Sequence, residues 1–334
     1  MSTTTIAMIA KEAGVSVPTV SKVLNGRPDV AQTTRQHVEQ VLEKHQYRRR
    51  NTSRSAGSRL VDLVFHELGS AWSVEIICGV ERAAHENGLN VVLSDLAGEH
   101  RPRQAWLDGV IARRPMGVIL VLSDLDPGQR RQLVTRNIPF VVVDTAGELP
   151  AGVPAVGSAN WNGGLVATRH LLELGHRRIG VVTGPADVMC SRQRTDGHRA
   201  ALDEAGIPYD PALILSGKFT AGSGYEQGLR LLDRPDRPTA IFAGNDLEAM
   251  GLLRAARDRG LRVPEDLSIV GYDDLQVAAW TTPRLTTVRQ PLVDMAHTAT
   301  TMLVRLAAGK PLTMPRIDLA TELVVRESTA PPAA

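Results

Sequence analysis

Polar side chains stand at the ends of three apolar runs that are typical of β-strands. Asp144 ends IPFVVVD, Asn245 ends IFAGN and Asp273 ends LSIVGYD. Carboxylate and amide groups exchange hydrogen bonds with hydroxyl groups of small molecules, and an amide donates and accepts at once. Because the carboxyl ends of parallel strands share one edge of a sheet, ligands bind there. The three residues are therefore candidate ligand contacts, although each could instead cap the helix that follows its strand.

Two blocks of alternating strand-like and helix-like segments surround these residues. The first block runs from LVDLVF at residue 60 to IPFVVVD, and the pattern restarts after residue 160 with GGLVATRHLLELG and RRIGVVTG. Such alternation predicts parallel sheets covered by helices, here two Rossmann-like lobes with a ligand site in the crevice between them. The end of the chain is expected to add a strand from Thr286, a helix over 293–307, the extended run DLATELVV and a disordered STAPPAA.

A different pattern occupies residues 6–25, IAMIAKEAGVSVPTVSKVLN. Apolar residues recur at helical spacing, Gly14 allows a turn with positive φ, and Ser16 can cap a second helix that has Pro18 in its first turn. Two short helices joined in this way predict a helix-turn-helix, whose second helix can enter the major groove of DNA. A small packed helix pair without a role in DNA binding is the alternative.

A third helix and a basic segment follow. Thr33 and Gln36 fit a capping box for a helix that runs to Tyr47. The stretch YRRRNTSRSAGSR, residues 47–59, is polar and basic and lacks apolar periodicity. This composition predicts a linker, and its arginines suit a DNA backbone or minor groove. A linker that serves only solubility is the alternative.

Charge and composition separate the two ends of the chain. Residues 1–60 hold ten Lys and Arg against four Asp and Glu, net +6, so the other 274 residues carry −4. A basic small domain on a mildly acidic body favours nucleic-acid binding at one end. Cys78 and Cys190 form neither a disulfide framework nor a metal motif, and neither a signal peptide nor a membrane span is evident. We expect a cytoplasmic protein without cofactor or metal, and the missing catalytic motifs argue against an enzyme.

Several motifs together resemble the lactose-repressor (LacI/GalR) family of bacterial transcription regulators. They are IAKEAGVSVPTVSKVLNG, LLELGHRRIGVVTGP, RQRTDGHRAAL, IFAGNDLEAMG and VPEDLSIVGYDD followed by PRLTTVRQP, and the likeness runs from Ile6 to about Arg326. The resemblance implies a small all-α helix-turn-helix headpiece on a body of two α/β lobes like that of periplasmic binding proteins. It also implies a homodimer on a pseudo-palindromic operator, and a sugar-like effector that shifts the lobe arrangement and the hinge.

The expected domains follow from this resemblance. Residues 1–46 form the headpiece and 47–60 the basic hinge. Residues 61–160 and 289–320 form an N-terminal effector-binding lobe, and 161–288 and 321–330 form a C-terminal effector-binding lobe.

The resemblance also implies which residues contact DNA. Positions matching Val17, Pro18 and Lys22 face base edges in the family: the first two could touch thymine methyl groups, and Lys22 could reach guanine or a phosphate. Val17 could instead belong to the headpiece core. Further positions match residues that anchor the DNA backbone. The predicted DNA-binding residues are Ser16, Val17, Pro18, Thr19, Ser21, Lys22, Asn25, Arg49, Arg50, Arg54 and Ala56.

The hinge departs from the family pattern. Many members have a proline–asparagine pair after the tyrosine and later a leucine that wedges into the minor groove. Here Arg49 and Arg50 replace the pair, and Ala56 stands at the leucine position. Alanine is too small to open a base step widely, so the central kink of the DNA is in question, and the arginines could occupy a narrow groove instead.

Effector contacts are implied by the same resemblance. Arg194 matches a family arginine that forks onto sugar hydroxyls or a carboxylate, a geometry that lysine does not copy. Trp72 and Phe219 match aromatic positions that stack on sugar rings, and Cys190 lies just ahead of Arg194. A surface salt bridge for the arginine and core packing for the aromatic rings are the alternatives. The predicted effector-binding residues are Trp72, Asp144, Cys190, Arg194, Phe219, Asn245 and Asp273.

The resulting hypothesis is a repressor of carbohydrate-utilisation genes that a small sugar releases from its operator. Within the same class, the alternative is a corepressor-dependent regulator with a non-sugar ligand. Outside that class, the alternative is a sugar-binding protein without a regulatory role.

The substitution Ala56→Leu tests the hinge interpretation. A leucine at a vacant wedge position should tighten operator binding or increase DNA bending, because its side chain is large enough to unstack a base step. Fluorescence anisotropy and a bending assay on the DNA upstream of the gene measure the two effects. If neither affinity nor bending changes, the hinge register is wrong or the arginines fill the role.

Overall fold

The computed structural model describes residues 5–24, 27, 29–45, 47 and 58–333 of the chain. One compact unit holds the chain up to Val143 together with Pro150–Val156 and Ala296–Arg316. The other holds Asp144–Leu149, Gly157–Met295 and the chain from Ile317 onward. The chain passes from one unit to the other near residues 156 and 295. The expected domain limits at these two crossings are residues 160 and 288. Asp144 therefore belongs to the same unit as Asn245 and Asp273.

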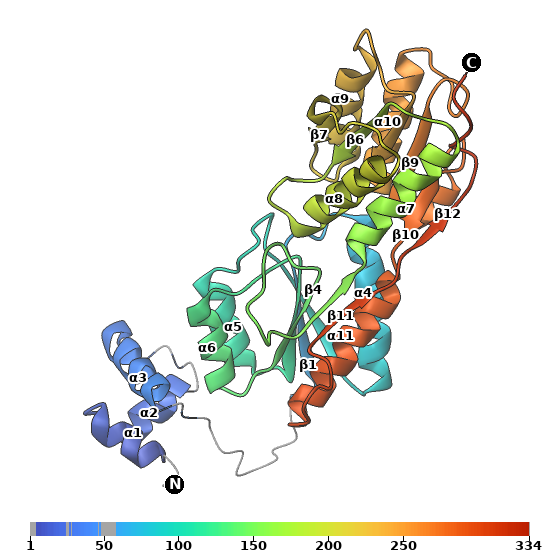
Figure 1. Ribbon diagram of the computed structural model, residues 1–334. Coiled ribbons are helices and arrows are strands. Elements are labelled where there is room, and N and C mark those ends of the chain that lie inside the picture. The colour runs from blue at the N-terminus through green and yellow to red at the C-terminus, as the bar shows by residue number, and fades with distance from the viewer. Residues whose placement is uncertain (1–4, 25–26, 28, 46, 48–57, 334) are drawn as a thin grey trace. The chain divides into compact units, whose positions relative to one another are not determined.

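Three helices at the N-terminus, blue in Figure 1, pack around a core of their own: α1 (Ile6–Glu12), α2 (Val17–Leu24) and α3 (Gln32–Lys44). Gly14 turns the chain with a φ of +63°, and the Ser16 hydroxyl accepts the N–H of Thr19 at 3.2 Å to begin α2. These features confirm the predicted helix-turn-helix. The buried apolar residues are Ile9, Ala10, Ala13, Val20, Val23, Leu24, Val38, Val41 and Leu42.

The third helix differs from the prediction at both ends. Its N-cap is Ala31, which makes no side-chain capping bond, so Thr33 lies inside the helix and the predicted capping box is wrong. Gln32 is a good helix former and extends the helix by one residue. The helix ends at Lys44. Tyr47 lies beyond the end of the helix and packs against the headpiece core. Burial of the apolar stripe, rather than the capping residue, sets the extent of this helix.

The first sheet has the strand order β11-β5-β4-β3-β1-β2. In Figure 1, α5 and α6 lie on one side of it, and α4 and α11 lie on the other. Strands β1 to β5 pair in parallel, as predicted. The strands are β1 (Leu60–Phe65), β2 (Asn90–Asp95), β3 (Gly117–Val121), β4 (Phe140–Val143), β5 (Ala155–Ser158) and β11 (Arg316–Leu319). The helices are α4 (Ala71–Glu86), α5 (Gln104–Arg113), α6 (Pro127–Thr135) and α11 (Leu292–Ala307).

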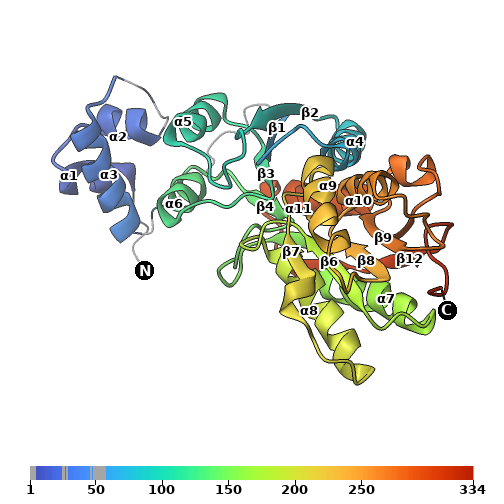
Figure 2. The same cartoon turned by 90° about the horizontal axis from the view of Figure 1, so that it is seen from above.

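The second sheet repeats this arrangement with the order β12-β10-β9-β8-β6-β7. Figure 2 shows α9 and α10 on one side of it and α7 and α8 on the other, and apolar clusters fill both interfaces. The strands are β6 (Ile179–Thr183), β7 (Ile214–Ser216), β8 (Ala240–Ala243), β9 (Ser268–Asp273), β10 (Thr286–Arg289) and β12 (Glu322–Val324). The helices are α7 (Asn160–Glu173), α8 (Met189–Glu204), α9 (Ala221–Leu232), α10 (Asp246–Asp258) and the short turns η1 (Pro211–Leu213) and η2 (Gln276–Ala279).

The matching strand orders confirm two Rossmann-like units built from a repeated block. In each sheet the first strand lies between the second and the third, which is the doubly wound order. The pair β10–β12 departs from the parallel pattern, because β12 runs antiparallel to β10. The carboxyl ends of β6, β8 and β9 therefore share one edge in the second unit.

The C-terminal tail corrects two predictions. The run DLATELVV is not one extended strand: it ends β11 in the first sheet and, after a break at residues 320–321, forms β12 in the second. The segment STAPPAA is ordered through residue 333 rather than disordered. Ser328 is fully buried and donates to the carbonyl of Ile269 at 2.6 Å, and His176 Nε2 lies 2.9 Å from the carbonyl of Ala330. Hydrogen bonds to the second sheet therefore hold a tail whose composition alone favours disorder.

Both cysteines are free, with Cys78 exposed and Cys190 buried. In the described ranges, no helix has an apolar stretch long enough to cross a bilayer. The same ranges contain no cluster of three or more His, Cys, Asp or Glu arranged to hold a metal ion.

An ion pair between a buried aspartate and an arginine whose side chain is 36% exposed fastens α5 to the first sheet. Asp62 points from β1 into the core with no exposed surface, and Arg113 at the end of α5 approaches its Oδ1 to 2.5 Å. Removing one partner of a buried pair leaves an uncompensated charge, which costs more than the pair itself contributes.

Arg113→Met should therefore lower the free energy of unfolding by about 3 kcal/mol. Urea unfolding followed by circular dichroism measures the loss. Arg103→Met is the matched control, because its ion pair with Glu99 is exposed and should contribute little to stability. Equal losses in the two variants would contradict the importance of the Asp62 charge.

Candidate functional site

The N-terminal end of α2 carries the predicted DNA contacts at the surface. Ser16, Val17 and Pro18 are exposed, whereas Val20 and Val23 on the opposite face are buried in the headpiece core. The Val17 side chain is 40% exposed, so it does not belong to that core. Its contact with DNA stays a prediction.

Lys22 forms an ion pair with Asp29, and both side chains are about half exposed at a distance of 2.7 Å. The bond from Lys22 lowers the pKa of the Asp29 carboxyl. Exposed ion pairs contribute little to stability. A DNA phosphate or guanine could therefore replace Asp29 as the partner of Lys22 at a small cost in free energy. Thr19 and Ser21 are half-buried beside it. The predicted contacts outside the described residues are Asn25, Arg49, Arg50, Arg54 and Ala56.

The predicted effector residues fall almost entirely in the second unit, where they gather around the guanidinium of Arg194. This side chain, from α8, is only 5% exposed. Its Nε donates to Asn160 Oδ1 at 2.8 Å, and its Nη1 donates to the main-chain carbonyl of Gly244 at 2.6 Å. The guanidinium also lies 3.6 Å from the ring centroid of Tyr272, a cation–π contact. The alternative of a surface salt bridge is therefore excluded for Arg194.

Two glycines bring Arg194 to this position. A methyl group at Gly164 of α7 would lie 2.1 Å from the carbonyl oxygen of Arg194, and one at Gly197 of α8 would lie 2.0 Å from that of Trp161. The helices α7 and α8 can cross so closely only because both positions lack a side chain. This crossing places Arg194 against Asn160 in the first turn of α7.

Asp273 lies at the end of β9, 3.9 Å from Arg194, and is almost fully buried. Its backbone φ is +111°, an unusual conformation for a residue with a side chain. Burial raises the pKa of the Asp273 carboxyl, while the charge of Arg194 and a 2.6 Å hydrogen bond from Gln290 oppose the rise. Gln290 in turn accepts from the hydroxyl of Ser158 at 2.5 Å. No local sequence pattern pointed to Gln290, because its partners Asp273 and Ser158 lie far away in the chain.

Asp144 presents a second buried carboxyl with a positive φ, +45°. Among the described residues, none forms a hydrogen bond to this side chain. Burial raises the pKa of Asp144 to about 6; Arg194 opposes the rise and Asp318 adds to it. A contact between the Asp144 carboxyl and a ligand hydroxyl stays a prediction.

Asn245 acts as a helix cap, the alternative that the sequence left open. Its Oδ1 accepts the N–H of Glu248 at 2.8 Å at the start of α10. Its Nδ2 donates to the carbonyl of Phe219 at 3.0 Å. The amide therefore ties α10 to the loop that carries Phe219, and a ligand contact by Asn245 stays a prediction.

The remaining candidates differ in their surroundings. Phe219 has a φ of +59°, and its ring lies 5.8 Å from the Arg194 guanidinium. Burial raises the pKa of the Cys190 thiol to about 11, so the thiol is poorly reactive, and its contact with an effector stays a prediction. Trp72 belongs to the other unit, where it is half-buried in the first turn of α4. A role for Trp72 in the same site, and the crevice expected there, stay predictions.

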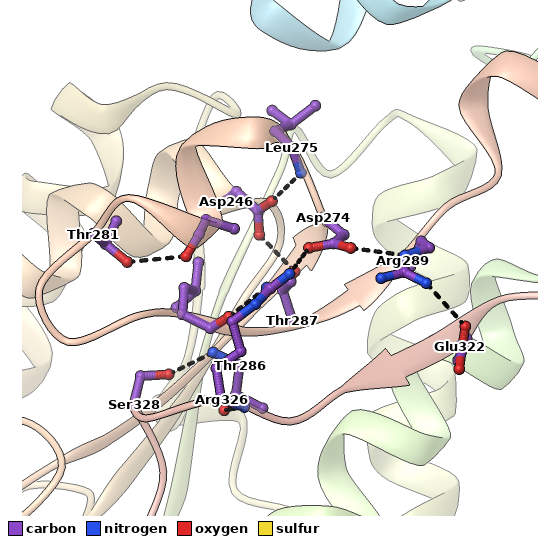
Figure 3. A network of polar contacts seen from close by, with 12 residues as sticks. Asp246, Asp274, Leu275, Thr281, Thr286, Thr287, Arg289, Glu322, Arg326 and Ser328 are labelled. Carbon is purple, nitrogen blue, oxygen red and sulfur yellow. Dashed lines mark hydrogen bonds and ion pairs between the residues drawn. The ribbon is translucent and has the colours of Figure 1, made fainter.

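A polar network supports the loop after β9, as Figure 3 shows. Asp246 is fully buried and accepts from the N–H of Leu275 at 2.7 Å and the hydroxyl of Thr287 at 2.6 Å. Asp274 accepts from Arg289 at 2.7 Å and Arg326 at 2.6 Å. These bonds hold the backbone of the residues that directly follow Asp273. Sequence reasoning missed both carboxylates, and the available signal was that each directly follows a predicted site residue.

The pKa of Asp144 leads to a stability test. Its raised value means that the folded chain keeps this proton up to about pH 6, whereas the unfolded chain releases it near 3.8. Between these values the folded state binds more protons, so rising pH lowers the stability of the wild type. Asp144→Asn should gain on the order of 2–3 kcal/mol relative to the wild type from pH 4 to pH 6, measured by urea unfolding.

Asp196→Asn is the control, because Asp196 is exposed on α8. Its unfolding free energy should track that of the wild type across the same range. A constant difference between Asp144→Asn and the wild type from pH 4 to pH 6 would contradict the buried, proton-holding state of Asp144.

Comparison with known proteins agrees with this arrangement. The family described as bacterial regulatory proteins, lacI family, matches residues 5–50, and the periplasmic binding protein-like domain matches residues 168–329. The first match covers the headpiece, and the second covers most of the unit that contains Arg194.

Similar proteins extend over nearly the whole chain. The HTH-type transcriptional repressor PurR of Escherichia coli is 34% identical over 330 residues, 98% of this chain and 97% of its own. A transcriptional regulator CelR–cellobiose complex is 34% identical with a TM-score of 0.76, over 97% of this chain and 99% of that one. A lac repressor dimer bound to operator and the anti-inducer ONPF is 27% identical with a TM-score of 0.73, over 98% and 100%.

These relatives are transcription regulators, and their similarity spans both the DNA-binding headpiece and the ligand-binding body. The chain is accordingly a DNA-binding regulator under the control of a small molecule and not an enzyme. It belongs to the LacI family of bacterial transcription regulators.

Proposed function

We propose that this protein is a repressor that binds its operator through α2 and is released from it by a small carbohydrate. The basic headpiece supports operator binding, since α2 carries Val17, Pro18 and Lys22 on its exposed face. The arginines of the hinge sequence add phosphate contacts, which make the affinity depend on salt.

The polar cluster around Arg194 carries the effector proposal. Burial raises the pKa of both carboxyl groups, so near neutral pH Asp144, with a pKa of about 6, mainly accepts hydrogen bonds, whereas Asp273 can accept or donate. Neutral hydroxyl groups suit this set better than an anion, which would add charge where carboxyl groups already outnumber the guanidinium. Phe219 supplies an aromatic face for a sugar ring. The relative CelR was solved as a complex with cellobiose, which supports the same ligand class.

We further propose that the protein acts as a homodimer in the cytoplasm, where two headpieces read one operator. The lac repressor relative was solved as a dimer on its operator, which supports this assembly. The effector releases DNA by binding one arrangement of the body more tightly than the other, because a ligand shifts an equilibrium only through such a difference.

Fluorescence anisotropy on the DNA upstream of the gene tests the proposal at fixed salt. The protein should bind tightly, and one member of a panel of mono- and disaccharides that includes cellobiose should release it. Lys22→Ala should weaken operator binding at least tenfold, about 1.4 kcal/mol, while Lys310→Ala outside the headpiece should leave it unchanged. Arg194→Lys should bind DNA normally and need at least tenfold more sugar for release.

The possible results separate the alternatives. Binding to DNA only when a ligand is present would mean that the ligand promotes operator binding, and it would favour the corepressor-dependent regulator. Tight operator binding that no sugar affects would support a DNA-binding regulator and reject a carbohydrate as its effector. Absence of sequence-specific binding under every ligand condition would reject the repressor itself.

A further inference from the structure

A buried carboxyl group lies directly behind Phe219. Glu248, in the first turn of α10, has no exposed surface. Its Oε1 accepts hydrogen bonds from the main-chain N–H of Phe219 at 3.0 Å and from the hydroxyl of Ser223 at 3.3 Å. Because burying an acid is costly, apolar packing does not account for its presence. Its contacts indicate that it holds the loop between β7 and α9.

Two glycines make room for this carboxyl group. A methyl group at Gly217 would lie 2.1 Å from its Oε1, and one at Gly244 would lie 2.7 Å from its Oε2. In the described part of the chain, Oε2 has no hydrogen-bond partner. A buried oxygen without a partner is poorly suited to carry negative charge, so the geometry favours the protonated carboxyl.

Phe219 depends on α10 for its conformation. Its φ of +59° lies in the left-handed region, which a bulky aromatic residue rarely adopts. Glu248 binds its N–H, and Asn245 binds its carbonyl. The ring then lies where a side chain at Gly184 would stand, 5.8 Å from the Arg194 guanidinium. Both main-chain groups of the strained residue are thus held by the first turn of one helix.

We propose that Glu248 is a positioning residue of the effector site, whose neutral carboxyl group keeps Phe219 in the conformation that brings its ring near Arg194. The inference rests on the proposed function for its effect on ligand binding, but not for its effect on the loop. Ionisation of Glu248 puts a charge on the unpartnered oxygen, and the loop opens to hydrate it. Ligands that stack on the Phe219 ring then bind more weakly.

The surroundings of Glu248 set the pH at which this happens. Burial raises its pKa to about 8, opposed by the bonds from Phe219 and Ser223 and by the charge of Arg194 on α8. Lys218 in the same loop opposes the rise through its main chain. The residues that directly follow strands β6 and β8 in this region are the uncharged Gly184 and Gly244. Because an open loop lets Glu248 ionise near its ordinary value of 4.5, the positioned state of Phe219 is expected to weaken progressively as the pH rises to about 8.

Hydrogen exchange of the Phe219 amide in the full-length protein tests the proposal directly. After correction for intrinsic exchange, protection of this amide in the wild type should fall at least fivefold from pH 7 to pH 9. In Glu248→Gln, which keeps an acceptor oxygen but does not titrate, protection should stay within twofold over that range. In Glu248→Met, which lacks the acceptor, the amide should exchange at least tenfold faster at pH 7.

Glu226→Gln on the exposed side of α9 is the matched control and should follow the wild type. Identical pH profiles for the wild type and Glu248→Gln would overturn the proposal. Retained protection in Glu248→Met would also overturn it. If Glu248→Met does not fold, the comparison of the wild type with Glu248→Gln still decides.

Calorimetric titration with cellobiose connects the loop to the effector site. The dissociation constant of the wild type should rise at least threefold from pH 7 to pH 9, and that of Glu248→Gln should change less. Equal rises in the two proteins would overturn the link to ligand binding. The exchange experiment needs neither DNA nor ligand, so a failure of the proposed repressor function is distinguishable from a failure of the role of Glu248.

Discussion

The buried guanidinium of Arg194 is the interaction on which the site in the second unit depends. It joins three elements at once: α8 supplies the side chain, Asn160 of α7 accepts from its Nε, and Gly244 after β8 accepts from its Nη1. A buried cation needs such partners, since its desolvation without them costs several kcal/mol. The close crossing of α7 and α8 through Gly164 is the steric condition for this geometry. Helix packing and the geometry of the proposed effector site are therefore coupled at one residue.

Buried acids outnumber the cation around this site. Asp273 and Asp144 lie within the electrostatic influence of Arg194, and burial raises the pKa of each. A carboxyl group that holds a proton near neutral pH, as the raised pKa of Asp273 allows, donates as well as accepts, which would widen the hydrogen-bonding choices for the proposed polyhydroxylated ligand. Asp144, Phe219 and Asp273 also have positive φ angles. Strained backbone of this kind persists only where surrounding contacts enforce it, and it is frequent at ligand sites.

The architecture of the body was largely predictable. Alternating apolar runs predicted the strands and helices of both units, because side-chain periodicity reports which face of a local element is buried. The helix-turn-helix was predictable for the same reason. The N-cap of the third helix lies two residues earlier than its capping signal suggested, and the run DLATELVV was divided between two sheets. Element boundaries and sheet membership depend on partners elsewhere in the chain, which a local pattern does not contain.

The sequence by itself determined the classes of element, their order, the family, and the placement of Asp144 and Asp273 at strand ends. Only the tertiary structure decided which of these polar groups are already engaged: Asn245 caps α10 and binds Phe219, whereas Asp144 has no partner among the described residues. It also revealed Gln290 beside Asp273. The physical reason is the range of the interactions. Periodicity and caps act over a few residues, while hydrogen bonds, burial and the resulting pKa shifts arise between segments that only folding brings together.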